Sequence, residues 1–213
     1  MQTLNLSTLK RVLCVGAHAD DIEIGCGGTL LKLCRDHGGL DVMWVVFSAE
    51  GARDREARRS ARSFLASGAA RRIVVKKFKG SFFPYQGAAI KSEFEKLKRF
   101  EPDVIFTHYR DDRHQDHRVL SDLTWNTFRR HLVLEYEVPK YDGDLGCPNF
   151  FVPLDEELCR RKVSYICKHF ETQAGRQWFD EETFMSLMRL RGIECPAPTR
   201  YAEAFYCRKV VAG

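Results

Sequence analysis

The strongest constraint on the fold is a regular alternation of short apolar segments with longer amphipathic ones in the first half of the chain. The apolar segments have the length and composition of buried strands and cover residues 13–17, 40–47, 72–78 and 103–108. Helical patterns occupy the intervals between them, at 25–37, 54–67 and 88–100. Parallel strands require crossover connections of this kind. The alternation therefore predicts an α/β fold, a Rossmann-like three-layer sandwich with a mostly parallel central sheet and helices on both faces.

The second half of the chain is less regular but continues the same types of element. We expect helices at 116–130 and 155–170, a strand at 132–138, a loop at 139–149 and a last strand at 201–210 that closes the sheet as an edge. The 213 residues suffice for one sizeable α/β domain. The prediction is a single domain over residues 1–213.

Composition narrows the class of protein. The first residues lack the features of a signal peptide, and no apolar run approaches the roughly 18 residues of a membrane span, so we expect a cytoplasmic protein without a membrane span. The formal charge of +5 arises from 34 basic and 29 acidic residues spread along the chain. It supplies no coherent basic stripe, which disfavours nucleic acid as a partner and leaves small molecules as the expected ligands.

The eight cysteines are scattered among apolar neighbours, and no two are spaced as CxxC. This pattern is typical of small core residues in a reducing compartment rather than of a disulfide framework or a thiolate zinc site. A metal site in this chain would therefore use nitrogen and oxygen ligands.

One imidazole and three carboxylates crowd the turn after the first predicted strand: His18, Asp20, Asp21 and Glu23. Carboxylates this close repel one another, and a divalent cation would compensate the repulsion. The alternative is local: Asp20 or Asp21 caps the following helix and Glu23 interacts with its dipole.

A second cluster lies after the fourth predicted strand, at residues 107–117. In a parallel sheet both turns fall at the carboxyl edge, where ligands bind. Four of the seven histidines lie in these two turns, at positions 18, 108, 114 and 117, whereas His37, His131 and His169 are expected to be structural or solvated. Catalytic zinc commonly takes three ligands from imidazole and carboxylate and leaves a fourth position to water. His18 and Asp21, three residues apart, can converge on one ion with His117, and Asp20 can then act as a general base beside the bound water.

The two clusters resemble the signatures of a known family. AHADDIEIGCGGT resembles the AHPDDE motif, and HQDH with its preceding Asp resembles the second motif, of the PIG-L/LmbE family of zinc-dependent N-acetyl deacetylases. Weaker similarities extend it over nearly the whole chain, at 50–51, 148–152, 172–173 and 201–205. Ala19 stands where the family usually has proline, which removes a stiffener of the turn but no ligand.

The resemblance implies a role for each residue of the two clusters. His18, Asp21 and His117 would bind zinc, or another divalent metal such as Fe²⁺; Asp20 would be the general base, His114 would stabilise the oxyanion and Asp116 would orient a histidine. Asp116 also fits a helix N-cap, and His108 has no matched role, which leaves it either structural or next to the substrate. The implied reaction is attack of a zinc-activated water on an amide carbon, with Asp20 accepting the proton.

The implied substrate is an N-acetylglucosamine-type sugar conjugate that loses its N-acetyl group or a similar acyl group. Arg53 and Arg55 would contact sugar hydroxyls or a phosphate, unless they are simply solvated at a helix start. The aromatic segment 81–85 would stack on a sugar ring, with core packing of Phe82 or Phe83 as the equal alternative. The sequence leaves open the aglycone, the acyl group and whether the protein forms a homo-oligomer.

Two other functions compete with this one. A metal-dependent phosphoesterase also uses Asp and His on a parallel sheet, but often with two metals about 4 Å apart. A nucleotide-binding module is suggested by Gly25, Gly27 and Gly28, although their spacing is not GxGxxG and the preceding aspartates would repel a phosphate.

Overall fold

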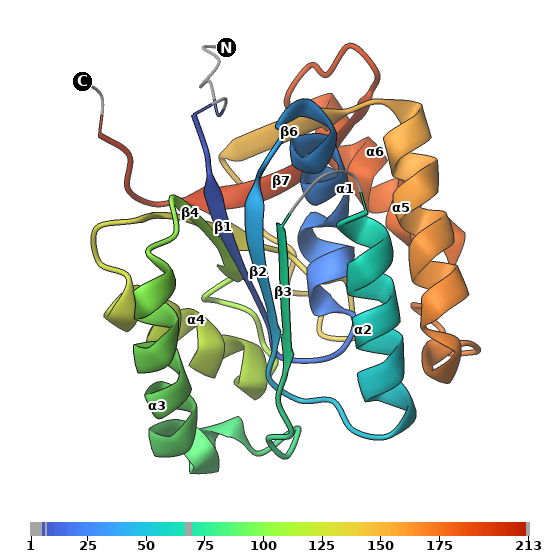
Figure 1. Cartoon of the computed structure of the whole chain (residues 1–213). Coiled ribbons are helices and arrows are strands. Elements are labelled where there is room, and N and C mark those ends of the chain that lie inside the picture. The colour runs from blue at the N-terminus through green and yellow to red at the C-terminus, as the bar shows by residue number, and fades with distance from the viewer. Residues whose placement is uncertain (1–5, 7, 67–69, 212–213) are drawn as a thin grey trace.

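The computed structural model of the chain describes residue 6, residues 8–66 and residues 70–211. Its centre is one seven-stranded sheet with the order β3-β2-β1-β4-β5-β7-β6 (Figure 1). The strands are β1 (Arg11–Gly16), β2 (Asp41–Val46), β3 (Ala70–Val75), β4 (Val104–His108), β5 (Leu132–Tyr136), β6 (Phe150–Leu154) and β7 (Tyr201–Cys207). The first five run parallel, so the α/β fold and the mostly parallel sheet predicted from the alternation are confirmed.

The far end of the sheet differs from the prediction. β7 is not an edge strand: it lies between β5 and β6 and pairs antiparallel with both. The edge position belongs to β6, a strand that the sequence analysis did not predict. β6 carries Pro153, which has no N–H for a ladder and is tolerated on an edge strand. A short strand interrupted by proline gives a weak sequence signal, whereas the longer, mostly buried β7 gives a strong one.

Helices cover both faces of the sheet. They are α1 (Asp21–Asp36), α2 (Ala52–Phe64), α3 (Gly87–Leu97), α4 (Gln115–Thr127), α5 (Glu156–His169) and α6 (Glu181–Glu194). Short 3₁₀ turns lie at Phe83–Gln86, Lys98–Phe100 and Glu171–Gln173. One face carries α3 and α4 and the other carries α1, α2, α5 and α6, with a separate apolar core under each group (Figure 1). The structure thus has the three layers expected of the fold.

Helix α6 was missed because its apolar residues are spread around the helix instead of forming one stripe. The predicted bounds of the other helices differ by a few residues at most ends. The last residue of the predicted helix 54–67, Ser67, lies outside the described residues. The largest difference is at α1, which begins at Asp21 rather than Gly25.

The glycines of α1 explain this difference. A Cβ on Gly25 would lie 2.1 Å from Tyr136, and one on Gly27 would lie 2.6 Å from Phe64. These glycines therefore let α1 pack closely on the sheet and on α2, and they lie inside the helix rather than in a loop that could wrap around a phosphate. The nucleotide-binding interpretation loses its only support.

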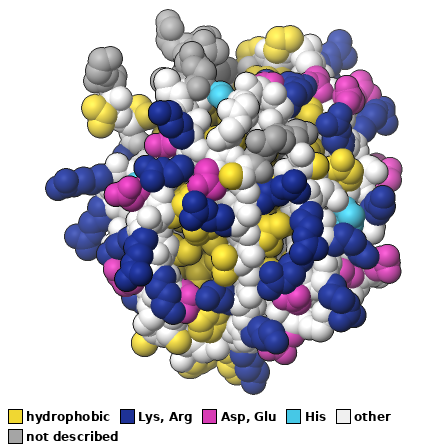
Figure 2. Space-filling model, in the orientation of Figure 1, with side chains coloured by type: hydrophobic (Ala, Val, Ile, Leu, Met, Phe, Trp, Pro, Cys, Tyr) yellow, Lys and Arg dark blue, Asp and Glu magenta, His cyan; other side chains and the backbone are white. Residues whose placement is uncertain are grey.

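The surface charges are mixed and the cysteines are unbridged, as the composition predicted. Lys and Arg are numerous on the face shown in Figure 2 but are interspersed with Asp and Glu. All eight cysteines are free, and four of them are buried. Within the described part of the chain, no helix is both long enough and apolar enough to cross a membrane.

Candidate metal centre

The two His/Asp clusters meet at the carboxyl edge of the sheet, as the sequence predicted. β1 and β4 pair as parallel neighbours and end at Gly16 and His108. The chain then enters α1 from the first cluster and α4 from the second. Side chains 98 and 99 residues apart in sequence are thereby in contact.

Three side-chain atoms of these clusters form a nearly equilateral triangle. His18 Nδ1 lies 3.2 Å from His117 Nε2 and 3.3 Å from Asp21 Oδ2, and His117 Nε2 lies 3.5 Å from Asp21 Oδ2. Ligand atoms held at 2.0–2.1 Å around one tetrahedral zinc ion are about 3.3 Å apart. The triangle therefore fits three corners of a zinc tetrahedron, and the fourth corner remains for water or substrate.

The hydrogen bonds on the far sides of the rings direct two lone pairs into this triangle. His18 Nε2 lies 3.1 Å from Asp116 Oδ2, and His117 Nδ1 lies 2.9 Å from Asp112 Oδ2. When each ring donates to its carboxylate, His18 Nδ1 and His117 Nε2 carry unshared pairs that face each other and the Asp21 carboxylate. Such an arrangement is repulsive unless a cation lies between the atoms, and a carboxylate behind each histidine is the usual support of a metal ligand.

Protonation in the metal-free protein is consistent with this repulsion. Burial alone lowers the pKa of His18, but the charges and hydrogen bonds of Asp21, Asp116 and Asp20 raise the pKa to about 10. For His117, burial and the neighbouring His108 lower the pKa to about 3. A metal ion bound at this cluster would therefore compete with a proton on His18.

The histidine that Asp116 contacts is His18, whose Nε2 lies 3.1 Å from Asp116 Oδ2. Asp116 is fully buried and accepts hydrogen bonds from the backbone N–H groups of Ser81 at 2.6 Å and Phe83 at 3.1 Å as well. Asp116 is not a helix N-cap. The cap of α4 is His114, whose Nδ1 accepts the backbone N–H of Asp116 at 3.2 Å.

His114 has the geometry of a hydrogen-bond donor facing the metal site. Because Nδ1 accepts a backbone N–H, the neutral ring carries its proton on Nε2. Burial and the charge of His18 lower the pKa of His114, which favours that neutral form. Its ring is 4.7 Å from that of His18 and 4.6 Å from that of His117, measured between centroids.

Asp20 lies next to the metal cluster and is paired with an arginine. Its Oδ1 accepts a hydrogen bond from Arg53 Nη2 at 3.0 Å, and the residue is 4% exposed. Burial raises the pKa of Asp20, and the Arg53 charge opposes that rise. Asp20 precedes α1 but its side chain makes no capping hydrogen bond, so the local helix-cap interpretation is not supported.

His108 is a structural neighbour of the site rather than a free ligand. Its Nε2 accepts the backbone N–H of Ala17 at 2.9 Å and lies 3.3 Å from Asp21 Oδ2. With that lone pair engaged, the buried ring supports the turn that carries His18 and packs on His117 at a centroid distance of 3.9 Å. Among the other histidines, His169 is buried against Ser63 Oγ, as expected of a structural residue.

Glu23 was grouped with the metal turn but contributes no ligand. It is fully buried on α1, burial raises its pKa well above the ordinary value, and neither carboxylate oxygen has a hydrogen-bond partner among the described residues.

A cleft of about 910 Å³ opens over the metal cluster. Its walls come from the two His/Asp turns, from residues 48–50 and 77–81 after β2 and β3, and from two stretches to which the sequence analysis assigned no contact, residues 138–142 and the one that contains Gln173, Arg176 and Trp178. Arg53 lines this cleft. Arg55, predicted with it, is exposed on α2 and does not line the cleft, so its predicted substrate contact gains no support. Phe83 is buried in the core, which supports the packing alternative for that residue, whereas Phe82 is exposed and does not line the cleft. Of the segment 81–85 the cleft is lined by Ser81.

Comparison with known sequences identifies a family and a curated relative. The sequence profile of the family described as PIG-L, GlcNAc-PI de-N-acetylase, matches residues 13–128, which is more than half of the chain and includes both His/Asp clusters. A curated relative, the uncharacterized deacetylase YaiS of Escherichia coli (strain K12), is 28% identical in an alignment of 173 positions that covers 75% of this chain and 90% of YaiS.

Solved structures share the fold at lower identity. The N,N'-diacetylchitobiose deacetylase of Pyrococcus horikoshii has a TM-score of 0.73 at 21% identity, over 94% of this chain and 84% of that one. The 4-carboxy-2-hydroxymuconate hydratase of Pseudomonas putida KT2440 has a TM-score of 0.72 at 16% identity, over 96% and 99%. The same fold therefore carries both deacetylation and hydration.

Proposed function

This chain belongs to the PIG-L family of de-N-acetylases, and we propose that it is a zinc-dependent hydrolase that removes the N-acetyl group, or a similar acyl group, from an N-acetylglucosamine-type conjugate. The observation that carries the proposal is the triangle of His18 Nδ1, Asp21 Oδ2 and His117 Nε2, with sides of 3.2–3.5 Å. The site lies in one domain that we take to span residues 1–213.

The three atoms of the triangle would hold the zinc ion, and Asp116 and Asp112 would keep the two imidazoles in the required tautomers. When bound, zinc supplies Lewis-acid activation of water and of the amide carbonyl. Two imidazoles and one carboxylate suit zinc, and they also suit Fe²⁺. The other carboxylates of the site are already engaged, Asp20 by Arg53, Asp112 by His117 and Lys140, and Asp116 by His18, which disfavours a second, bridged metal and with it the phosphoesterase alternative.

Asp20 is the proposed general base. It follows the ligand turn, lines the cleft and is almost fully buried, so its carboxylate can face the attacking water with little competition from solvent. Arg53 holds Oδ1 and leaves Oδ2 to take the proton from water and return it to the departing amine nitrogen. The Arg53 charge opposes the rise that burial causes in the pKa of Asp20 and so favours the ionised form before the reaction.

His114 is the proposed donor to the oxyanion. As the carbonyl carbon becomes tetrahedral, negative charge develops on its oxygen, and a neutral imidazole with its proton on Nε2 can donate to that oxygen. The backbone N–H of Asp116 fixes the ring in that tautomer, so the donor is preorganised before substrate enters.

The substrate-binding part of the proposal rests on the cleft. Arg53 reaches it from the start of α2, and Tyr141 and Trp178 contribute aromatic side chains to its walls. A volume of about 910 Å³ exceeds what an acetylated monosaccharide fills and leaves room for an aglycone. The diacetylchitobiose activity of the P. horikoshii structural neighbour suggests the sugar class.

The test is acetate release from a panel of N-acetylglucosamine conjugates by protein loaded with one equivalent of zinc. The proposal predicts equimolar acetate and free amine for at least one conjugate, and turnover at least about a hundredfold slower with Asp20→Asn at the same zinc content. Release of phosphate from phosphorylated members of the panel, or addition of water to an unsaturated acid without acetate release, would contradict it and point to the phosphoesterase or hydratase alternative.

A further inference from the structure

Asp112, which supports the metal ligand His117, has more than one partner. Its Oδ2 lies 2.9 Å from His117 Nδ1 and 3.0 Å from Lys140 Nζ, and its Oδ1 accepts the backbone N–H of His114 at 2.8 Å. The Asp112 side chain is 2% exposed. Burial alone would raise the pKa of Asp112, but the hydrogen bond from His117 and the charges of His117, His108 and Lys140 hold the pKa below its ordinary value.

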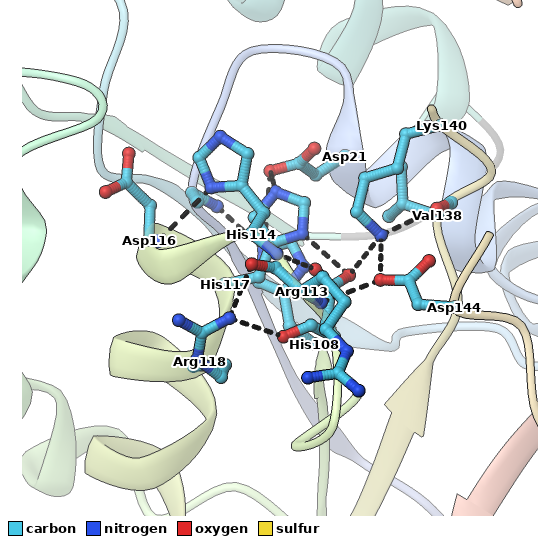
Figure 3. Close-up of polar contacts among 12 residues, drawn as sticks. Asp21, His108, Arg113, His114, Asp116, His117, Arg118, Val138, Lys140 and Asp144 are labelled. Carbon is cyan, nitrogen blue, oxygen red and sulfur yellow. Dashed lines mark hydrogen bonds and ion pairs between the residues drawn. The ribbon is translucent and has the colours of Figure 1, made fainter. Parts of the chain in front are cut away.

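Lys140 bridges Asp112 to a second buried carboxylate. Its Nζ lies 2.5 Å from Asp144 Oδ2 and 3.4 Å from the Val138 carbonyl oxygen (Figure 3). Asp144 Oδ2 also accepts the backbone N–H of Arg113 at 2.7 Å. The side chains of Lys140, Asp112 and Asp144 are 10%, 2% and 7% exposed, so one ammonium group balances two carboxylates that solvent hardly reaches.

Lys140 also belongs to a wall of the cleft. The segment Val138–Asp142 lines the cleft, and the loop that contains it runs from the end of β5 to the start of β6. The Lys140 ammonium group thus connects this loop to Asp112, the carboxylate that supports the metal ligand His117. Removing it would leave two buried carboxylates facing each other across the space it occupied, and their repulsion would turn Asp112 away from His117 or displace the loop.

We propose that Lys140 is a positioning residue for the metal ligand His117: by balancing Asp112 and Asp144 it keeps Asp112 on His117 Nδ1 and couples the 137–149 loop to the metal site. The role of His117 as a ligand rests on the proposed function, but the coupling itself is independent of which substrate enters. Lys140 does not touch the reacting atoms in this proposal.

The primary test is zinc affinity, measured by competition with a chromophoric chelator on the full-length protein. Loss of a group that supports a metal ligand commonly weakens metal binding by about 10–100-fold, and we expect Lys140→Met to fall in that range. Lys140→Arg, which keeps the charge, should bind zinc within about threefold of the parent, as should Lys77→Met, a matched control in the same cleft without an ion pair among the described residues.

Two double variants test the route through the carboxylates. Lys140→Met combined with Asp144→Asn removes the repulsion as well as the cation and should recover most of the lost affinity. In an Asp112→Asn background, Lys140→Met should add little further loss, because the residue through which it acts is already gone. This cycle compares folded variants with one another, so a general decrease in stability does not imitate its result.

Turnover at saturating zinc separates positioning from substrate binding. If Lys140 positions His117, Lys140→Met regains most of its kcat once zinc is saturating. Unchanged zinc affinity with a raised KM would overturn the proposal and make Lys140 a substrate contact, and additive losses in the Asp112→Asn background would overturn it as well. Absence of acetate release from the parent would contradict the proposed function while leaving the affinity result valid.

Discussion

Replacement of Asp116 by Asn tests how the metal site is built. The carboxylate is fully buried and accepts three hydrogen bonds, from His18 Nε2 at 3.1 Å and from the backbone N–H groups of Ser81 and Phe83 at 2.6 and 3.1 Å. An asparagine of the same shape offers one acceptor oxygen, and its NH₂ group must face at least one of these donors.

The size of the effect follows from that mismatch. One buried donor without an acceptor costs about 1–3 kcal/mol, and about 2 kcal/mol corresponds to a fall of roughly 4–8 °C in Tm for a chain of this size. Zinc affinity should fall by about 10–100-fold, because His18 loses the charged carboxylate that holds its tautomer and ring orientation. The assays are chelator competition for zinc and thermal unfolding in EDTA.

The matched control for this variant is Asp122→Asn, on the same helix α4 but exposed, which should leave both zinc affinity and Tm unchanged. If Asp116→Asn bound zinc as tightly as the parent, the tautomer argument for His18 would be wrong.

Three further predictions concern turnover, substrate and pH. Asp20→Asn should keep its zinc but lose at least about a hundredfold in kcat, as expected for a general base. His114→Ala should lose about a hundred- to thousandfold in kcat, as expected for an oxyanion donor. Both are measured by acetate release at saturating zinc, and full activity of either variant would refute the role of that residue. Arg53→Ala should raise the KM for an N-acetylglucosamine conjugate, whereas Arg55→Ala, outside the cleft, should not. Equal effects on KM would show that the cleft is not where the substrate binds. The pKa of His18 is raised to about 10 in the metal-free protein, so zinc must displace its proton at any lower pH. Apparent zinc affinity should therefore rise about tenfold per pH unit between pH 7 and 9, with one proton released per ion in calorimetry across buffers. A flat profile would mean that His18 is already deprotonated.

The sequence was sufficient to predict the meeting of the two His/Asp clusters because one rule decides it: parallel strands end at the same edge of a sheet. Gly16 and His108 end neighbouring strands, so His18 and His117 had to come close whatever the details of the loops. The ligand triangle, by contrast, needed the structure, since distances of 3.2–3.5 Å depend on ring orientations that carboxylates elsewhere in the chain determine.

Those carboxylates show where sequence reasoning stops. Asp116 was expected to orient a histidine, but only the fold identifies His18, 98 residues away, as its partner. Asp112 was noted only as part of a motif, and Lys140 was assigned no contact, because their contact depends on the course of the loop between β5 and β6. No local periodicity encodes that course.

Helix α6 and strand β6 were missed for different physical reasons. Apolar residues are spread around α6, so it lacks the stripe by which helices are recognised, and β6 is a short edge strand interrupted by Pro153. The sequence could not distinguish Arg53 from Arg55 either. The two residues lie two positions apart at the start of α2, and only the direction in which each side chain leaves the helix decides which one lines the cleft.

The central claim is that one zinc ion is held by His18, Asp21 and His117, and anomalous diffraction at the zinc edge from crystals of zinc-loaded protein tests it most directly. We predict a single peak per chain, about 2.0–2.2 Å from His18 Nδ1, Asp21 Oδ2 and His117 Nε2, with the fourth position open. Two peaks about 4 Å apart, or one peak bound by other residues, would contradict the account.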